Sequence, residues 1–287
     1  MVAAAALLSW FLVGLQAGLL RSLGVGKSVR SDGPESHLAK AGTPSMGGVA
    51  FTLAAGLLYL LADARPLAPV FLLALGYGLL GLADDLGGLY GRPLKAREKL
   101  AVQFLLAVVF AVFALRTVSY TPWPALDFVL IALAVVGAAN AFNFTDGLDG
   151  LAAGVSAVIL LPFLHLPLAQ LFLGALLGFL WHNAPKARIF MGDAGSQLLG
   201  ALVAGLFILE GKAWYLPLAA IVPVLEVLSV VLQVAWFRRT GRRLLRMAPL
   251  HHHFELLGWG EAKVVVRFVV LTAVATALAV QLWGGGA

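Results

Sequence analysis

Eight stretches without Asp, Glu, Lys or Arg dominate this 287-residue sequence and restrict its fold more than any other feature. Hydrophobic residues make up 61% of the chain and charged residues only 12%, whereas about 25% of residues are charged in typical soluble proteins. Helices satisfy their own backbone hydrogen bonds in lipid, so the stretches predict an all-α polytopic membrane helix bundle. They cover residues 2–20, 45–62, 66–83, 100–115, 128–145, 150–181, 194–209 and 268–287.

The stretches predict about ten transmembrane helices within a single domain, residues 1–287. Residues 150–181 are too long for one crossing of about 20 residues, and His165-Leu-Pro offers a turn in their middle. They therefore count twice, and residues 213–237, interrupted only by Glu226, add one more. The longest charge-rich stretch, residues 238–267, is too short for a separate soluble domain.

The cations predict that both termini lie outside the cytoplasm. No Lys or Arg precedes the first apolar stretch, so we expect a retained span rather than a cleaved signal peptide. In this orientation 17 of the 20 Lys and Arg residues lie in cytoplasmic loops, where they set topology and would also attract anionic headgroups or a phosphorylated substrate. The first such loop carries Arg21, Lys27, Arg30 and Lys40, and the three cations left outside are Arg65, Arg116 and Lys212.

Every polar cluster falls at the cytoplasmic end of a predicted span, which indicates one shared site at the inner membrane surface. The chain has no cysteine, so any metal must bind oxygen or imidazole. Carboxylate oxygens are ligands that Mg²⁺ or Mn²⁺ prefers, and phosphate chemistry is the natural inference. The clusters are Lys40 with residues 42–48, Asp84-Asp85, residues 140–149, Asn183, residues 190–193 and residues 249–253.

Two acidic motifs also have purely structural explanations. Asp84 and Asp85 are adjacent, so on a helix they would point in different directions and could not share one ligand position. Asp193 begins an apolar stretch, where its carboxylate could simply cap a helix. The same helix N-terminus would equally suit a phosphate.

The segment of residues 140–150 is the strongest indication of function. Asn140 and Asn143, like Asp146 and Asp149, are three residues apart and would be neighbours on a helical surface. Gly147 would permit an unwound turn or a close backbone approach. Carboxylates are costly to bury in a membrane protein, so we expect them to serve transport or catalysis.

The histidines of residues 251–253 lie inside the chain, and we expect them to contact phosphate rather than to bind a metal. Consecutive residues cannot easily face one ion. Glu226 is an intramembrane carboxylate and hence a functional hypothesis, with a buried hydrogen bond to a neighbouring span as the alternative.

Five ordered motifs resemble the phospho-N-acetylmuramoyl-pentapeptide transferase family, within the polyprenyl-phosphate N-acetylhexosamine-1-phosphate transferase superfamily. The resemblance runs nearly end to end, and residues 249–255 distinguish the muramoyl-pentapeptide enzymes from relatives that use other sugar nucleotides. The motifs are residues 40–48, 84–85, 140–152, 190–196 and 247–255.

The resemblance implies a ten-span, usually homodimeric enzyme of the bacterial cytoplasmic (inner) membrane, with a cytoplasmic-facing active site. It also implies a bent or broken ninth span, which Pro223 fits. The implied reaction transfers phospho-MurNAc-pentapeptide from UDP-MurNAc-pentapeptide to undecaprenyl phosphate with Mg²⁺, forming lipid I and UMP in peptidoglycan biosynthesis. The expected partners are these two substrates and the lipid bilayer, and no nucleic acid.

By motif position, the resemblance also implies residue roles. Asp84, Asp85, Asp193 and His251 would be catalytic, with Asp193 as the metal ligand. The implied substrate-binding residues are Lys40, Thr43, Lys99, Asn140, Asn143, Phe144, Asp146, Asp149, Asn183, Phe190, Gln233, His252 and His253.

Three departures from the family pattern concern this site. Ser45 replaces the usual Thr, and Phe142 and Phe144 replace smaller aliphatic residues. No lysine closely follows Asp85, so either Lys99 or Lys95 would supply that charge.

The acceptor chemistry favours direct displacement on the sugar-bearing phosphorus. A phosphate monoester with a second pKa near 6 is mostly a dianion at pH 7, so no strong base is required. A phospho-enzyme on Asp84 or Asp85 is the alternative. Two other functions stay open: a sister enzyme for another hexosamine phosphate, and a transporter or flippase. A transporter should carry polar residues across the midplane, whereas only Glu226 and Gln233 lie deep in a span.

Overall fold

The computed structural model describes residues 1–26, 40, 42–62 and 67–284, and all regular secondary structure in these ranges is helical. The predicted all-α fold is confirmed, while Lys27, Arg30 and Arg65 lie outside the described residues. The longer helices are α1 (Val2–Ser22), α2 (Gly47–Leu61), α3 (Ala68–Leu89), α4 (Ala96–Ala114), α5 (Pro124–Thr145), α6 (Leu151–Leu160), α7 (Pro167–Asn183), α8 (Asp193–Leu209), α10 (Ile221–Thr240) and α12 (Glu261–Gly284). Shorter helical segments are η3 (Leu161–Phe163), η4 (Ala213–Tyr215), α9 (Leu216–Ala219) and α11 (Leu250–Leu256).

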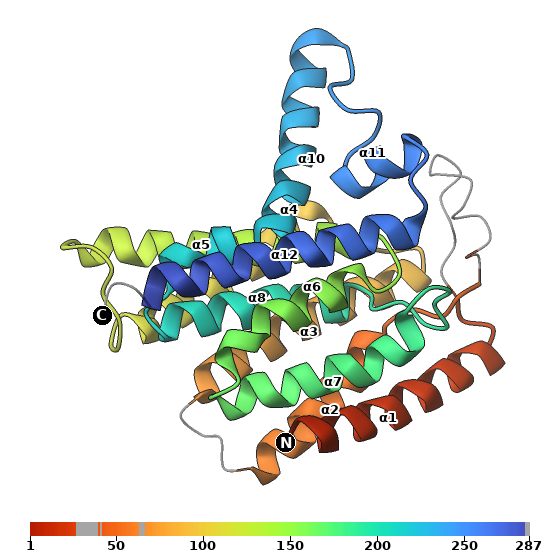
Figure 1. The fold of residues 1–287 in the computed structure, drawn as a ribbon, viewed down its shortest axis with the longest axis horizontal. Helices are drawn as coiled ribbons and strands as arrows, with labels where there is room; N and C mark the ends of the chain where they lie inside the picture. The colour runs from red at the N-terminus through yellow and green to blue at the C-terminus, as the bar shows by residue number, and fades with distance from the viewer. Residues whose placement is uncertain (27–39, 41, 63–66, 285–287) are drawn as a thin grey trace.

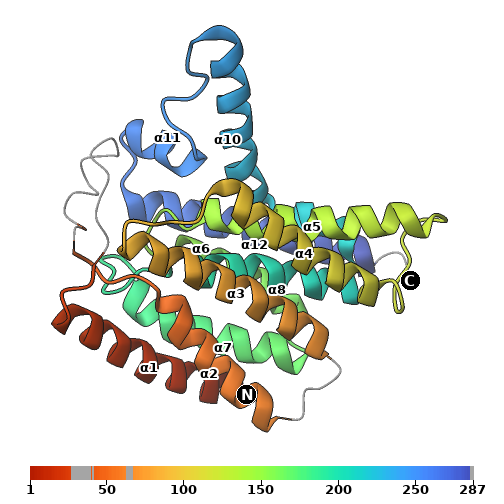
Figure 2. The ribbon, with the colours of Figure 1, turned by 180° about the vertical axis from the view of Figure 1, so that it is seen from behind.

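Most of the longer helices lie side by side in one bundle, and α10 rises across their direction (Figure 1). The view from behind shows the same arrangement, with α11 beside α10 (Figure 2). Five described helices are long and apolar enough to cross a membrane: α1, α3, α5, α10 and α12. Three shorter apolar segments accompany them, at Gly47–Leu61, Leu151–Phe163 and Asp193–Leu209. These apolar helices fit a multi-pass membrane protein.

The long apolar stretch of residues 150–181 divides into two helices, as predicted. α6 ends at Leu160, the 3-10 turn η3 follows, and α7 begins at Pro167. Proline suits the first turn of a helix because the N–H group that it lacks would have no partner there. The expected turn at His165 therefore reverses the chain between α6 and α7.

The stretch that precedes the histidines is broken, as the resemblance implied. α9 ends at Ala219 and α10 begins at Ile221, with Ala220 at φ −93° and ψ 35°. Pro223 has no N–H to donate to the carbonyl of Ala219, four residues earlier. The Thr276 Oγ1 of α12 donates to that carbonyl instead, at 3.3 Å. The proline and its substitute donor together explain why α10 leaves the bundle.

Glycines bring α3 and α2 into backbone contact with α8 near its first turn. A Cβ added to Gly81 would lie 2.1 Å from the Asp193 carbonyl oxygen, and one added to Gly48 would lie 2.2 Å from the Gly195 nitrogen. Small residues allow such close packing between membrane helices, where burial of apolar surface gives little preference for helix contact over lipid. The start of α8, with Asp193, is thereby held between two other helices.

We predict that Gly81→Ala destabilises the protein, because the new methyl group must push α3 away from α8. Overpacking of this kind costs about 1–3 kcal/mol. Gly88→Ala on the same helix is the matched control, since a Cβ there meets no atom within 4 Å. Thermal unfolding in detergent should show a lower midpoint for Gly81→Ala and an equal or slightly higher one for Gly88→Ala. Equal midpoints for both variants would contradict the tight packing.

Candidate active site

The polar motifs of distant segments meet at one end of the bundle. Lys99 of α4 contacts Asp84 of α3 and Asp193 of α8. In a second cluster, Lys40 contacts Asp149, which lies 109 residues later between α5 and α6. Acidic residues of α3 and α8 thus share one lysine, and a second lysine pairs with the acidic turn that follows α5.

Lys99 bridges two carboxylates that were predicted to be catalytic. Its Nζ donates to Asp84 Oδ2 at 3.1 Å and makes a short ion pair with Asp193 Oδ2. The backbone N–H of Leu94 donates to the other Asp84 oxygen at 2.8 Å. Lys95 is exposed at the N-terminus of α4, where its backbone N–H meets Glu98. Of the two lysines considered from the sequence, the structure brings Lys99 into the site.

Asp85 caps α8 across the helix interface. Its Oδ1 accepts from the N–H of Asp193 at 3.1 Å, and its Oδ2 from that of Ala194 at 3.0 Å. A carboxylate is stabilised at a helix N-terminus by these free donors and by the helix dipole. The cap therefore comes from α3 and not from Asp193, whose own carboxylate is left for Lys99 and Asn143.

Side-chain amides connect α5 with α8 behind the carboxylates. The Asn143 Nδ2 donates to Asp193 Oδ1 at 2.8 Å and to Ser196 Oγ at 2.9 Å. Asn140 lies one turn earlier and donates to Gln103 Oε1 at 2.8 Å, and Gln103 donates to Gln197 Oε1 at 3.0 Å. These contacts give each amide a defined orientation in an apolar surrounding.

Gln103 and Gln197 were missed by sequence reasoning. Both are fully buried, and both belong to stretches that were treated as uncharged spans. A signal was available, because glutamine is rare in the middle of an apolar helix and Gln197 lies one turn after Asp193. Their depth in α4 and α8 extends the polar network from the carboxylates toward the bundle interior.

Lys40 forms the second ionic cluster of the site. Its Nζ donates to Asp149 Oδ1 at 2.7 Å and to Glu261 Oε1 at 2.5 Å. Burial lowers the pKa of Lys40, but the hydrogen bonds to both carboxylates outweigh this effect and raise the pKa above its ordinary value. Glu261 also accepts from the Asp149 N–H at 2.8 Å. No sequence motif singled out Glu261, which begins α12 as an ordinary first-turn acid.

Backbone pairing holds the Lys40 segment against the segment that precedes Asp193. The N–H of Phe190 donates to the Pro44 carbonyl at 2.8 Å, and that of Gly47 donates to the Phe190 carbonyl at 2.9 Å. Met46, between them, is a non-glycine residue at φ 69°, a conformation that costs energy and that its buried setting maintains. Half-buried Thr43 closes a turn onto the Lys40 carbonyl at 3.2 Å.

Asn183, predicted to bind substrate, uses its amide to hold two loops. Its Oδ1 accepts from the Gly150 N–H at 3.0 Å, and its Nδ2 donates to the Ile189 carbonyl at 3.0 Å. The side chain is buried. In this structure Asn183 therefore positions the acidic turn and the segment that leads to Phe190.

The two phenylalanines that depart from the family pattern differ in their surroundings. Phe142 is fully buried in the core, whereas Phe144 is 37% exposed near the end of α5. Asp146 follows as the C-terminal cap residue of the same helix. Only Phe144 of the pair, together with half-buried Phe190, has exposed surface to offer a ligand.

The side chains of residues 251–253 and of Gln233 contact nearby groups of the protein rather than open solvent. His251 is 1% exposed, His252 Nδ1 lies 2.8 Å from Glu255 Oε2, and His253 Nδ1 accepts from the Arg246 N–H at 3.2 Å. The Gln233 Oε1 accepts from the N–H groups of Leu244 and Leu245 at 3.0 and 2.8 Å. Gln233 thus holds the returning chain that leads to the histidines.

The carboxylates around Asp193 are of the chemical type that divalent cations prefer. Among the residues that the structure describes, no group of three or more His, Asp or Glu side chains could hold a metal by itself. Mg²⁺ is commonly bound through one or two carboxylates together with substrate phosphates and water. Asp193 and Asp84, which share the Lys99 ammonium, offer carboxylate oxygens of this kind.

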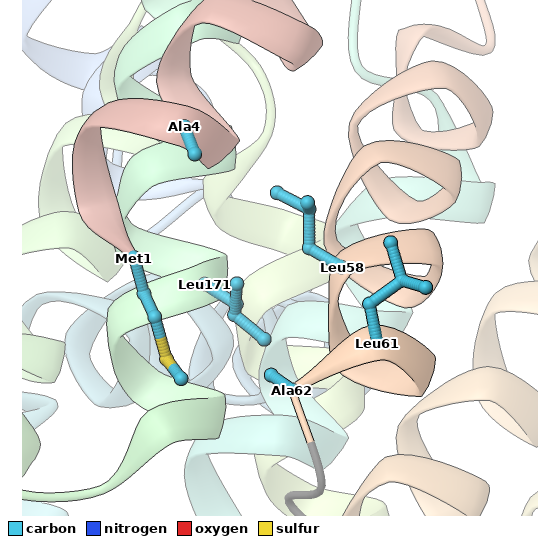
Figure 3. Close-up of a pocket in the computed structure, with 6 residues that line it drawn as sticks. All are labelled: Met1, Ala4, Leu58, Leu61, Ala62 and Leu171. Carbon is cyan, nitrogen blue, oxygen red and sulfur yellow. The ribbon is translucent and has the colours of Figure 1, made fainter.

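Two hollows lie away from the ion pairs. A groove of about 420 Å³ follows α10 and is lined by Val230, Gln233, Val234, Phe237, Arg238, Arg243, Met247 and Ala248. A smaller apolar hollow of about 140 Å³ lies between α1, α2 and α7, as the close-up in Figure 3 shows. It includes Met1, at the opposite end of α1 from the polar motifs, and its lining offers no polar side chain for chemistry.

Comparisons with known proteins identify the family of this chain. A model described as glycosyl transferase family 4 matches residues 67–211, and signature 1 of phospho-N-acetylmuramoyl-pentapeptide-transferase matches residues 40–51. Proteins with the latter name are similar along nearly the whole chain. The relative from Deinococcus radiodurans is 46% identical over 310 residues and that from Deinococcus deserti 51% over 303 residues, each alignment covering 99% of both chains. The relative from Moorella thermoacetica is 46% identical over 286 residues, with 89% of both chains covered.

The chain belongs to the phospho-N-acetylmuramoyl-pentapeptide transferase family. The resemblance seen in the sequence is thereby confirmed. The matched signature of this family includes Lys40 and Gly48, which the structure places in the second ionic cluster and in the close contact with α8. The family's motifs therefore coincide with the residues that assemble the polar end of the bundle.

We predict that Asp85→Ala lowers the free energy of unfolding by about 1–2 kcal/mol, the usual effect of losing a helix cap. Denaturant unfolding in detergent micelles would measure this change. Glu210→Ala is the control at the other end of α8, because Glu210 pairs with the exposed His165 and such surface pairs contribute little. An Asp85→Ala variant as stable as the Glu210→Ala variant would refute the capping role.

Proposed function

We propose that this chain is a Mg²⁺-dependent phosphosugar transferase that moves phospho-MurNAc-pentapeptide from UDP-MurNAc-pentapeptide to undecaprenyl phosphate. The products are lipid I, used in peptidoglycan synthesis, and UMP. The observation that carries this proposal is the joining of Asp84, Lys99 and Asp193 at the polar end of a chain of this family. Family membership supports the substrates, because the relatives carry the name of this transferase.

The residues around Asp193 suit a reaction between two anions. A phosphate acceptor and a diphosphate donor repel each other, so the site must neutralise charge and align the two groups. Mg²⁺ bound at Asp193 would supply positive charge to the phosphates. The ammonium of Lys99 would add further positive charge, and Asn143 keeps the Asp193 carboxylate in one orientation.

The contacts of the paired aspartates favour direct displacement over a phospho-enzyme. Asp85 has both oxygens on backbone N–H groups of α8, and Asp84 has its oxygens on Lys99 and Leu94. Carboxylates stabilised in this way are poor nucleophiles. We therefore infer that the acceptor phosphate attacks the sugar-bearing phosphorus directly and that UMP leaves.

We further propose ten crossings, with both termini outside and the site facing the cytoplasm, in a bacterial inner-membrane homodimer. The ten are α1 to α5, α6 with η3, α7, α8, α9 with α10, and α12. The cation distribution supports the orientation. An aromatic cluster at the other end, where Trp283 contacts Phe207 and Tyr215, is typical of a membrane interface and suits the outer surface.

We predict that the purified protein releases UMP from UDP-MurNAc-pentapeptide only with both Mg²⁺ and polyprenyl phosphate. Asp193→Asn and Lys99→Met should each lower the rate at least about 100-fold, because charge stabilisation in the transition state is lost. Lys95→Met is the matched control and should keep the wild-type rate, since Lys95 is exposed outside the ion pairs. Released UMP is measured by chromatography.

Replacing the nucleotide-sugar donor in the same assay tests the substrate specificity of the transferase. UDP-GlcNAc in place of the muramoyl nucleotide should yield no UMP, and efficient release would instead indicate a sister enzyme. No release under any condition, with binding or transport of lipid, would favour the transporter alternative.

We predict that labelled UMP does not exchange into UDP-MurNAc-pentapeptide when polyprenyl phosphate is absent. Direct displacement requires the lipid acceptor before the phosphorus–oxygen bond to UMP breaks, whereas a phospho-enzyme would form without it. The measurement follows the label by chromatography after incubation with Mg²⁺, and a reaction that contains lipid I serves as the positive control. Exchange without any lipid would overturn direct attack.

A further inference from the structure

Glu226 of α10 is a buried carboxylate that none of the roles above uses. Its side chain is 0% exposed, and it lies six residues after the break at Ala220. A carboxylate excluded from water is strongly destabilising unless it is hydrogen-bonded or paired. Its partners therefore indicate why the helix retains a carboxylate at this depth.

Both oxygens of Glu226 face a single residue, His251. The backbone N–H of His251 donates to Oε1 at 3.2 Å and to Oε2 at 3.4 Å, and the ring Nδ1 lies 3.1 Å from Oε2. The imidazole is 1% exposed. The carboxylate thus holds the main chain of the histidine that the sequence motif marks as catalytic, and it lies beside the ring of that residue.

The other edge of the His251 ring meets the acidic turn between α5 and α6. A Cβ added to Gly147 would lie 2.1 Å from His251 Nε2, so the ring packs directly on the backbone between Asp146 and Leu148. Within the described parts of the chain, neither ring nitrogen of His251 makes a hydrogen bond, so the 3.1 Å approach of Nδ1 to Glu226 Oε2 is an electrostatic contact and not a hydrogen bond. His251 therefore connects α10 on one side with the turn that carries Asp146 and Asp149 on the other.

Gln233 reinforces this arrangement from the same face of α10. It lies seven residues, or about two helical turns, after Glu226. Its amide holds Leu244 and Leu245, while Glu226 holds His251. Glu226 and Gln233 thereby hold both ends of the returning segment, residues 244–251.

We propose that Glu226 is a positioning residue for the transferase reaction, acting through His251. Its carboxylate keeps Nδ1 toward α10 and Nε2 toward the turn of residues 146–149, so that ring and turn hold one arrangement beside the substrate site. A carboxylate close to one imidazole nitrogen favours one orientation of the ring. Glu226 does not touch substrate, and its role rests on the proposed function.

A double-mutant cycle with Glu226→Gln and His251→Ala tests this role through UMP release. Loss of such a supporting carboxylate is expected to lower kcat about 10–100-fold, with less than about threefold change in KM for either substrate. In the His251→Ala background, Glu226→Gln should cause no further loss, because its effect passes through the missing ring. If Glu226→Gln does not accumulate in folded form, Glu226→Asp, which withdraws the carboxylate by one methylene group, replaces it in the cycle.

Ser229→Ala is the matched control on α10. Ser229 is buried like Glu226, but its hydroxyl bonds within its own turn, to the Glu226 carbonyl at 2.6 Å. It should keep the wild-type kcat, which separates positioning from general damage to the helix. A Gly147→Ala variant gives a second test, since its methyl group should lower kcat in the wild-type background and not in His251→Ala.

The outcomes separate this inference from the proposed function. Independent, multiplicative losses in the double mutant, or full kcat in Glu226→Gln, would overturn the positioning role while the transferase stands. Wild-type protein that releases no UMP would remove both. A kcat loss that disappears in the His251→Ala background supports Glu226 as the residue that orients the histidine.

Discussion

Carboxylates at the end of an apolar helix bundle must find compensating partners, and this requirement organises the structure. Asp193 is the centre of that compensation: Lys99 neutralises it, Asn143 orients it, and its own N–H is capped by Asp85. Each partner comes from a different helix, so satisfying one carboxylate draws α3, α4 and α5 around the start of α8. The reacting groups are therefore assembled by the same contacts that make their burial tolerable.

Close backbone packing makes this assembly possible. In lipid, apolar surface alone gives helices little reason to associate, and association depends on shape and on polar contacts. Gly81 and Gly48 allow α3 and α2 to approach the first turn of α8 until backbone atoms touch. A bulkier residue at either position would move the Asp193 carboxylate relative to Lys99, so stability and chemistry depend on the same two glycines.

Helix positions could be predicted from the sequence because apolar stretches and membrane thickness constrain each other. The α6–α7 turn was found for this reason, whereas the break before Pro223 was implied by the family resemblance. Partners of the polar groups could not be predicted, since they depend on the rotation and depth of helices far apart in the chain. Asp85 caps a helix 108 residues later, and Glu261 meets Lys40 across 221 residues. Motif resemblance identified Lys40 and Asp149 but carried no information on Glu261, the other acid that pairs with the lysine.

The departure of α10 from the bundle explains why its polar residues are needed. Thr276 satisfies the carbonyl that Pro223 leaves free, and beyond Pro223 the buried residues of α10 end at Ser229. Glu226 and Gln233 then hold the returning chain against α10, and His251 packs its ring on the turn at Gly147. A helix that leaves the bundle can therefore still present the histidine segment to the acidic residues of the site with a fixed orientation.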